Sequence, residues 1–126
     1  MTTEEIQIIV DRVYPLIQKY YGKGKLNIPK IELHKDIYAR ISGIDGMEGE
    51  ESHSSKAQYE GNDNIIYIYY PNMVNEEDVI RSIIHEHTHY KQDSELFQKY
   101  RDMYDYDEDP TEIEAHKNEE DWHLFI

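Results

Sequence analysis

Three side chains that can carry metal and proton chemistry lie within the short stretch "HEHTH". His85 and His89 are four residues apart, and Glu86 follows the first of them. Residues four apart on a helix are neighbours, so the two imidazoles lie roughly 5–6 Å from each other. Both can then reach one zinc ion at about 2.0–2.1 Å. Glu86 is rotated by about 100° around the helix, where its carboxylate can hold a water molecule and accept its proton. The spacing therefore predicts one Zn²⁺ ion with a general base beside it.

His87 lies between these residues but is expected to have a different role. It continues the apolar stripe formed by Ile80, Ile83 and Ile84, and that stripe should pack against the rest of the chain. We therefore expect His87 to be a hydrogen-bonded, buried or half-buried residue and not a metal ligand.

A catalytic zinc site usually has three protein ligands and leaves a fourth position for water. The chain contains no cysteine, so the third ligand should be a carboxylate or a histidine of the last segment. The candidates are Glu112, Glu114, His116, Glu119 and Glu120. Glu112 fits a capping box with Asp109, and Glu119 and Glu120 belong to an acidic run that should face water.

Glu114 is the favoured third ligand because of the residues that share its helix face. Asn118, Trp122 and Phe125 follow it at spacings of four, four and three. A face that ends in aromatic residues should pack inward. Glu114 would then point towards the helix that carries the two histidines.

The segments "HEHTHYKQ" and "DPTEIEAHKN" together resemble the gluzincin class of zinc metallopeptidases. More narrowly, they are similar to minimal single-domain gluzincins and to small phage- or plasmid-type metallopeptidases. The resemblance covers about residues 57–122. It implies that His85, His89 and Glu114 bind zinc, that Glu86 is the general base, and that Asn118 takes the place of an aspartate that orients the first histidine. An amide oxygen can accept the same imidazole N–H but adds no negative charge.

Larger enzymes of that class use a second domain to supply a histidine or tyrosine that stabilises the oxyanion. We expect no second domain of that kind in these 126 residues, so the candidates for the role are Tyr104, Tyr106 and His116. An extended peptide substrate could add to an exposed edge of the sheet. Strand 57–60 and strand 65–70 are both candidates for that edge.

The helices expected to hold this site have clear sequence signals. Residues 3–20 have apolar residues at helical spacing, with Thr3 as N-cap, and Pro15 is expected to kink or interrupt that helix. A second helix should run from about 76 to 92 behind an Asn75 cap. A third helix should begin at Asp109 and continue to the C-terminus.

Between the first two helices the sequence predicts strands. Residues 27–36 alternate in polarity, with Pro29 suited to an edge or a strand start. Residues 42–56 are typical of a long surface loop. Two further strands, 57–60 and 65–70, should be joined by a turn at 61–64. We expect an α+β fold of zincin-like type, with a small antiparallel sheet of about three strands, in a single domain spanning residues 1–126.

The charge of the chain limits its partners. With a formal net charge of −14, a phosphate backbone is not an expected partner, although an acidic mimic of DNA is a weaker alternative. No apolar run approaches membrane-spanning length, and the start of the chain has no basic leader pattern. We expect a cytoplasmic monomer that acts on a peptide or protein, with no nucleic acid or membrane partner.

Two functions remain in competition. The first is a zinc metalloendopeptidase in which Glu86 activates water. The second is a zinc-stabilised binding or regulatory module with little or no catalytic activity. The expectation of a single domain, without an assured oxyanion donor, favours the second function.

Overall fold

The computed structural model describes residues 1–36, 40 and 55–126. The chain begins with helix α1 (Thr3–Tyr21), whose N-cap is Thr2 and not the expected Thr3. Thr2 and Glu5 form a reciprocal capping box there. The helix continues through Pro15 without interruption. Pro15 lies on its exposed face, where water can hydrogen-bond the carbonyl group that the ring leaves without a partner.

Three strands form one sheet in the order β1-β3-β2, with β1 at Lys30–His34, β2 at Ala57–Glu60 and β3 at Ile65–Tyr69. The antiparallel prediction holds for β2 with β3, but β1 runs parallel to β3. β3 is central because it pairs with β2 along one edge and with β1 along the other, and these two edges have opposite pairing directions. The expected loop at 42–56 lies almost entirely outside the described residues.

The hairpin turn and the edges of the sheet agree with the sequence pattern. Asn64 has φ of 54°, a left-handed conformation that asparagine tolerates better than most residues. Because β3 is central, strand 57–60 is an edge strand and strand 65–70 is not. The outer edge of β2 lies next to the helix that carries Glu86, because the Tyr59 backbone N–H on β2 donates to the Glu86 carboxylate.

The remaining elements are helical. Helix α3 (Glu76–Lys91) begins at Asn75, whose side chain accepts the Asp78 backbone N–H. A 3₁₀ turn, η2 (Tyr70–Asn72), precedes it. Helix α4 (Ser94–Met103), the short η3 (Tyr106–Glu108) and helix α5 (Pro110–Glu119) follow. The predicted last helix is thus shorter than expected, because it gives way to the 3₁₀ segment η4 (Glu120–Phe125).

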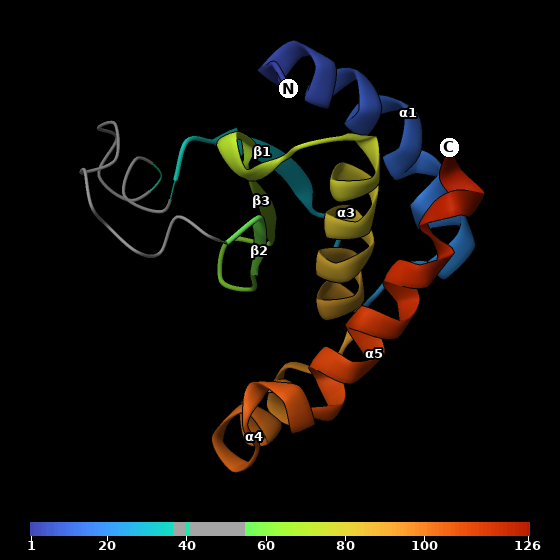
Figure 1. Cartoon of the computed structure of the whole chain (residues 1–126). Helices are drawn as coiled ribbons and strands as arrows, with labels where there is room; N and C mark the ends of the chain where they lie inside the picture. Colours follow the sequence, from blue (N-terminus) through green and yellow to red (C-terminus); the bar gives the residue numbers. More distant parts are fainter. Residues whose placement is uncertain (37–39, 41–54) are drawn as a thin grey trace.

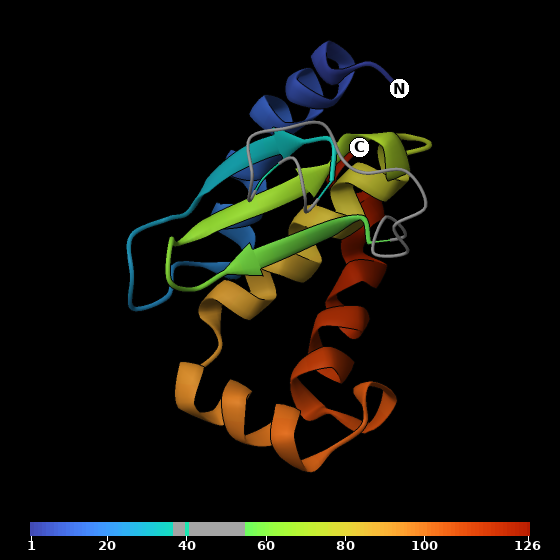
Figure 2. The same cartoon turned by 90° about the vertical axis from the view of Figure 1, so that its left-hand side faces the viewer.

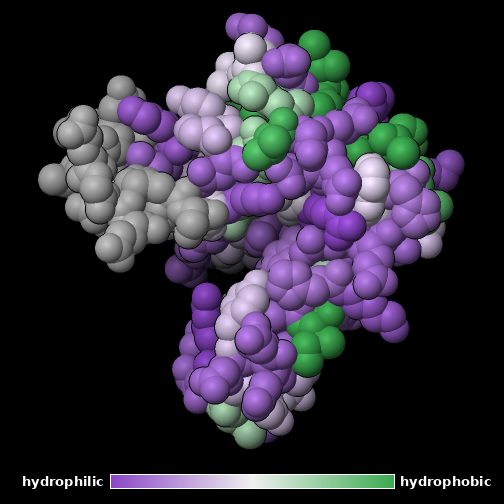
Figure 3. All heavy atoms as spheres, in the orientation of Figure 1, coloured by the Kyte–Doolittle hydropathy of each residue, from purple (hydrophilic) through white to green (hydrophobic). Residues whose placement is uncertain are grey.

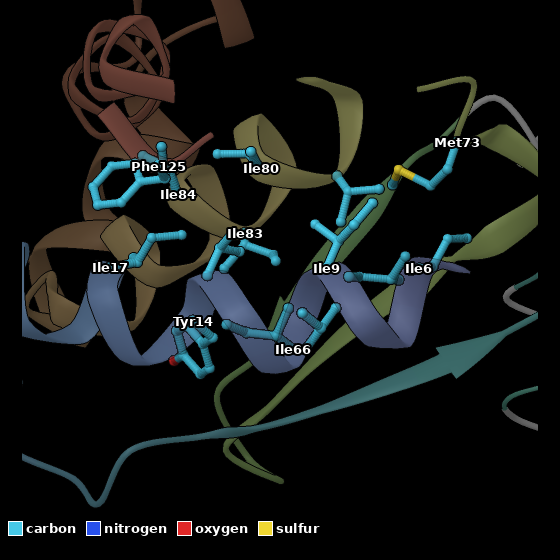
Figure 4. Close-up of a cluster of buried hydrophobic side chains, with 14 residues drawn as sticks. Ile6, Ile9, Tyr14, Ile17, Ile66, Met73, Ile80, Ile83, Ile84 and Phe125 are labelled. Atoms are coloured by element: carbon cyan, nitrogen blue, oxygen red, sulfur yellow. The ribbon is translucent and has the colours of Figure 1, made fainter. Parts of the chain in front are cut away.

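The core lies between α1, α3 and the sheet (Figures 1 and 2). One cluster of buried side chains extends along the sequence from Ile6 to Phe125 and takes most of its members from α1, β3 and α3 (Figure 4). Ile80, Ile83 and Ile84 are fully buried, as the apolar stripe predicts. Among the described residues, no helix has both the length and the apolar character needed to cross a membrane.

Candidate metal centre

Three potential ligand atoms converge where α5 crosses α3. His85 Nε2 lies 3.0 Å from Glu112 Oε1, His89 Nε2 lies 3.1 Å from the same oxygen, and the two Nε2 atoms are 3.1 Å apart. Ligands of a tetrahedral zinc ion with bonds of 2.0–2.1 Å are separated by about 3.3 Å. The triangle is therefore close to one face of such a tetrahedron, and two neutral imidazoles with one carboxylate form a donor set that suits zinc.

The carboxylate that joins the histidine pair belongs to Glu112 and not to the expected Glu114. Asp109 caps α5 by accepting hydrogen bonds from the backbone and side chain of Thr111, so the Glu112 carboxylate is not used in a capping box. Glu114 is exposed and accepts a hydrogen bond from Gln92 Nε2 at 2.8 Å. The predicted face does point towards α3, but its Glu114 meets Gln92, three residues beyond His89.

Each histidine of the pair is held through its second ring nitrogen. His85 Nδ1 lies 2.6 Å from Glu119 Oε2, and His89 Nδ1 lies 2.7 Å from Gln92 Oε1. Such contacts fix the ring orientation and leave Nε2 free for a metal. The role expected for Asn118 therefore belongs to Glu119, because the Asn118 amide donates instead to Thr88 Oγ1. The prediction that Glu119 faces water is also wrong, since its side chain is only 17% exposed.

The sequence contains a second pattern on α5, distinct from the face that ends in Trp122 and Phe125. Glu112, His116 and Glu119 are spaced by four and three, so they share one face of α5. That polar stripe complements the spacing of His85 and His89 on α3. This polar stripe predicts that Glu112 and Glu119 lie beside His85 and His89.

The electrostatics of the cluster favour a bound cation. Burial lowers the pKa of His85, but hydrogen bonds to Glu112 and Glu119 outweigh burial and raise the pKa to about 10. Burial likewise raises the pKa of Glu112, yet the hydrogen bonds with His85 and His89 hold that pKa well below its usual range. The carboxylates therefore stabilise positive charge at this point, whether it is carried by imidazolium or by a metal ion.

Glu86 lies beside the triangle, as the sequence predicts. Its side chain is buried, and its Oε1 accepts the backbone N–H of Tyr59 on β2 at 2.8 Å. Burial raises the pKa of Glu86, although the neighbouring imidazoles of His85 and His89 partly oppose that rise. A carboxylate with a raised pKa next to a metal site suits a general base that later returns its proton.

Two of the three oxyanion candidates lie at the site. Tyr106 Oη is 2.9 Å from His116 Nε2, and His116 Nδ1 is 3.0 Å from Glu119 Oε2. The third candidate, Tyr104, is exposed and packs against the ring of Tyr100.

His116 also belongs to a looser group of possible metal ligands. Its ligand atom and those of His85 and Glu112 lie within 4.8 Å of one another. The tighter triangle with His89 fits a single ion better, because its longest edge is 3.1 Å.

A cavity of about 570 Å³ opens in front of these residues. Its walls are the edge strand β2 and helix α4, and α3 and α5 form its floor. Figure 3 shows the surface hollowed between the sheet and α4. The lining combines the triangle with Glu86, Tyr106 and His116, so the three potential ligand atoms and these neighbouring acid and base side chains face one solvent-accessible space.

His87 confirms the expectation of a core histidine. It is completely buried, with Nδ1 2.9 Å from Tyr14 Oη and Nε2 2.8 Å from the carbonyl oxygen of Gly22. Burial lowers its pKa. Both ring nitrogens are thus occupied by α1 and the residue that follows it, and neither is available to a metal ion.

When the chain is compared with models of protein families, with curated proteins and with solved structures, no match is found.

Proposed function

We propose that this protein is a zinc-dependent peptidase that hydrolyses peptide bonds, with Glu86 as general base. The observation that carries the proposal is the triangle of His85 Nε2, His89 Nε2 and Glu112 Oε1, with edges of 3.0–3.1 Å, beside a buried carboxylate. Zinc bound there supplies a Lewis acid that lowers the pKa of water and polarises a carbonyl oxygen. Glu112 replaces Glu114 in the proposed ligand set.

The side chains around the triangle can carry out the proton transfers of hydrolysis. Glu86 takes a proton from the attacking water and returns it to the leaving amine. Its hydrogen bond with the Tyr59 N–H keeps the carboxylate oriented towards the cavity. The Tyr106 hydroxyl, held by His116, donates to the carbonyl oxygen as negative charge develops there. We retain both residues as candidates for this role and set Tyr104 aside.

The edge of the sheet supports a peptide as the substrate. In an antiparallel pair, alternate residues of an edge strand point their backbone groups away from the partner strand. The Tyr59 N–H is one of these outward groups, because it reaches Glu86 on α3. An extended peptide along β2 would therefore lie next to the triangle. The cytoplasmic location, the monomeric state and the absence of nucleic acid and membrane partners stay predictions.

The Glu86→Gln variant tests the proposal. The amide keeps the size of the side chain but cannot act as a base, so we expect zinc content to remain and cleavage of a peptide library to fall by about 10²–10⁴-fold. Zinc content measured on the same preparation separates loss of the base from loss of the metal. Undiminished cleavage by this variant would remove Glu86 from the mechanism.

A zinc-stabilised binding module is the second candidate. The observation that favours it is the hydrogen bond from the Tyr59 N–H to Glu86, because this contact gives Glu86 a structural role that needs no catalysis. A metal ion would then link α3 to α5. Zinc-dependent stability without cleavage of any peptide in the library would favour this module over the peptidase.

A further inference from the structure

The cationic side chains that line the cavity differ in their partners. Lys56, at the start of β2, forms an ion pair with Asp78 at 2.8 Å. Arg101 is exposed on α4, and within residues 1–36, 40 and 55–126 no carboxylate lies close enough to form an ion pair with it. Of the Lys and Arg side chains that line this cavity, Lys56 is therefore neutralised and Arg101 has no carboxylate partner among the described residues.

Aromatic contacts hold Arg101 near the proposed zinc ligands. The Arg101 guanidinium lies over the Phe97 ring at 5.3 Å from its centroid, and the two residues are four apart on α4. The Phe97 ring in turn packs edge-on against the His89 imidazole, with centroids 5.2 Å apart. Two ring contacts therefore separate the guanidinium from a ligand histidine, a distance that about three residues of extended peptide can span.

The chemistry of this position identifies the group that it would bind. A guanidinium presents a planar fork of donors that matches a carboxylate. A phosphate would also fit the fork, but its additional charge would meet Glu86, Glu112 and Glu119, which face the same cavity. A singly charged carboxylate experiences less of that repulsion.

We propose that Arg101 binds a substrate carboxylate within about three residues of the scissile bond. The inference rests on the proposed peptidase function, because it assumes that a peptide lies between β2 and α4. The carboxylate is either the C-terminus of a short peptide or an acidic side chain. Recognition of the C-terminus would make the protein an exopeptidase or a peptidase of short peptides, whereas recognition of a side chain would give cleavage near aspartate or glutamate.

Binding measured without cleavage tests this assignment. The probes are N-acetylated random hexapeptide pools offered to the zinc-loaded Glu86→Gln protein, in four forms. The C-terminus is either a free acid or an amide, and the random positions contain either Asp and Glu or only Asn and Gln in their place. Bound peptides are quantified by mass spectrometry. We expect about tenfold stronger retention of the pools that carry the recognised carboxylate, and the arm that shows the difference identifies its source.

Variants of α4 separate Arg101 from general electrostatics. Arg101→Gln should abolish the tenfold preference and Arg101→Lys should keep part of it. Lys99→Gln removes the same charge from an exposed position of the same helix outside the cavity lining, and should leave the preference intact. Equal retention of all four pools, or a preference that survives in Arg101→Gln, would overturn the assignment. Neither result depends on peptide cleavage, so failure of this inference is distinct from failure of the peptidase proposal.

Discussion

Helix α3 carries histidines in two contrasting environments within a single turn. His87 faces α1 and is completely buried, with both ring nitrogens bonded to uncharged oxygen atoms. His85 and His89 face α5, and their Nε2 atoms share the Glu112 carboxylate. Burial lowers the pKa of His87, whereas the pKa of His85 is raised to about 10 because Glu112 and Glu119 outweigh burial.

The difference shows that the element covering each face of the helix decides what its histidines do. Tyr14 of helix α1 supplies a hydroxyl group, and Gly22, directly after that helix, supplies a carbonyl group. These two uncharged groups hold the imidazole of His87 in its neutral form. Helix α5 supplies two carboxylates that attract positive charge. The same residue type is structural on one face and a candidate ligand on the other, and the two faces can be separated by mutation.

The largest expected effect is on metal affinity. His89→Ala removes one of three ligands from a site whose total binding free energy is on the order of 10 kcal/mol or more, so zinc affinity should fall by at least a hundredfold. His87→Ala should leave zinc affinity within a few-fold of wild type. Competition titration with a zinc chelator provides the measurement. Equal losses of zinc affinity in the two variants would show that the two faces of α3 do not differ in metal binding.

The next effect is on folding stability, where His87→Ala should have a larger effect than His89→Ala. His87→Ala opens a cavity in the core and leaves the buried Tyr14 hydroxyl without its partner, which should cost about 2–4 kcal/mol of unfolding free energy. His89→Ala should cost less when both proteins are free of metal. Urea denaturation in the presence of a chelator tests this order.

A smaller effect on metal affinity is expected from the residue that orients His85. Glu119→Gln weakens the contact at Nδ1, which should reduce zinc affinity by about 10–100-fold. Glu120→Gln is the matched control, because Glu120 is exposed and immediately follows it. If both variants bind zinc like the wild type, Glu119 does not position His85 in the way proposed here.

The two environments should also give the metal-free protein opposite pH dependences. The folded pKa of His85 lies above its usual value of 6.5. Its contribution to stability is therefore complete below about pH 6.5 and is lost as pH rises towards 10. The folded pKa of His87 lies below 6.5, so its contribution is complete above pH 6.5 and is lost as pH falls below that value.

Denaturation curves across pH 5–10 would resolve these two limbs. His85→Gln should reduce the alkaline limb, to which His89 also contributes because its pKa is raised as well. His87→Gln should flatten the acidic limb, and neither variant should remove the other limb. A single variant that flattens both limbs would show that the two histidines titrate as one unit.

Local patterns predicted helices α1, α3 and α5, the hairpin and the motif, because periodicity, caps and turn residues act over a few positions. They did not place helix α4. Asn75, Asp109 and the apolar stripe of α3 are where the sequence places them. The parallel pairing of β1 with β3 and the choice of Glu112 depend on how distant segments meet. The sequence offers four other acidic or histidine candidates in the last segment, and only the crossing of α5 over α3 distinguishes between them.

Metal analysis of two single variants tests the central claim most directly. Zinc in the purified wild-type protein should be close to one ion per chain, should be retained by Glu114→Ala, and should be lost from Glu112→Ala. Circular dichroism of each preparation ensures that folded proteins are compared. Zinc retained by Glu112→Ala but lost from Glu114→Ala, or a wild-type protein that binds no zinc, would contradict the convergence of His85, His89 and Glu112 on one ion.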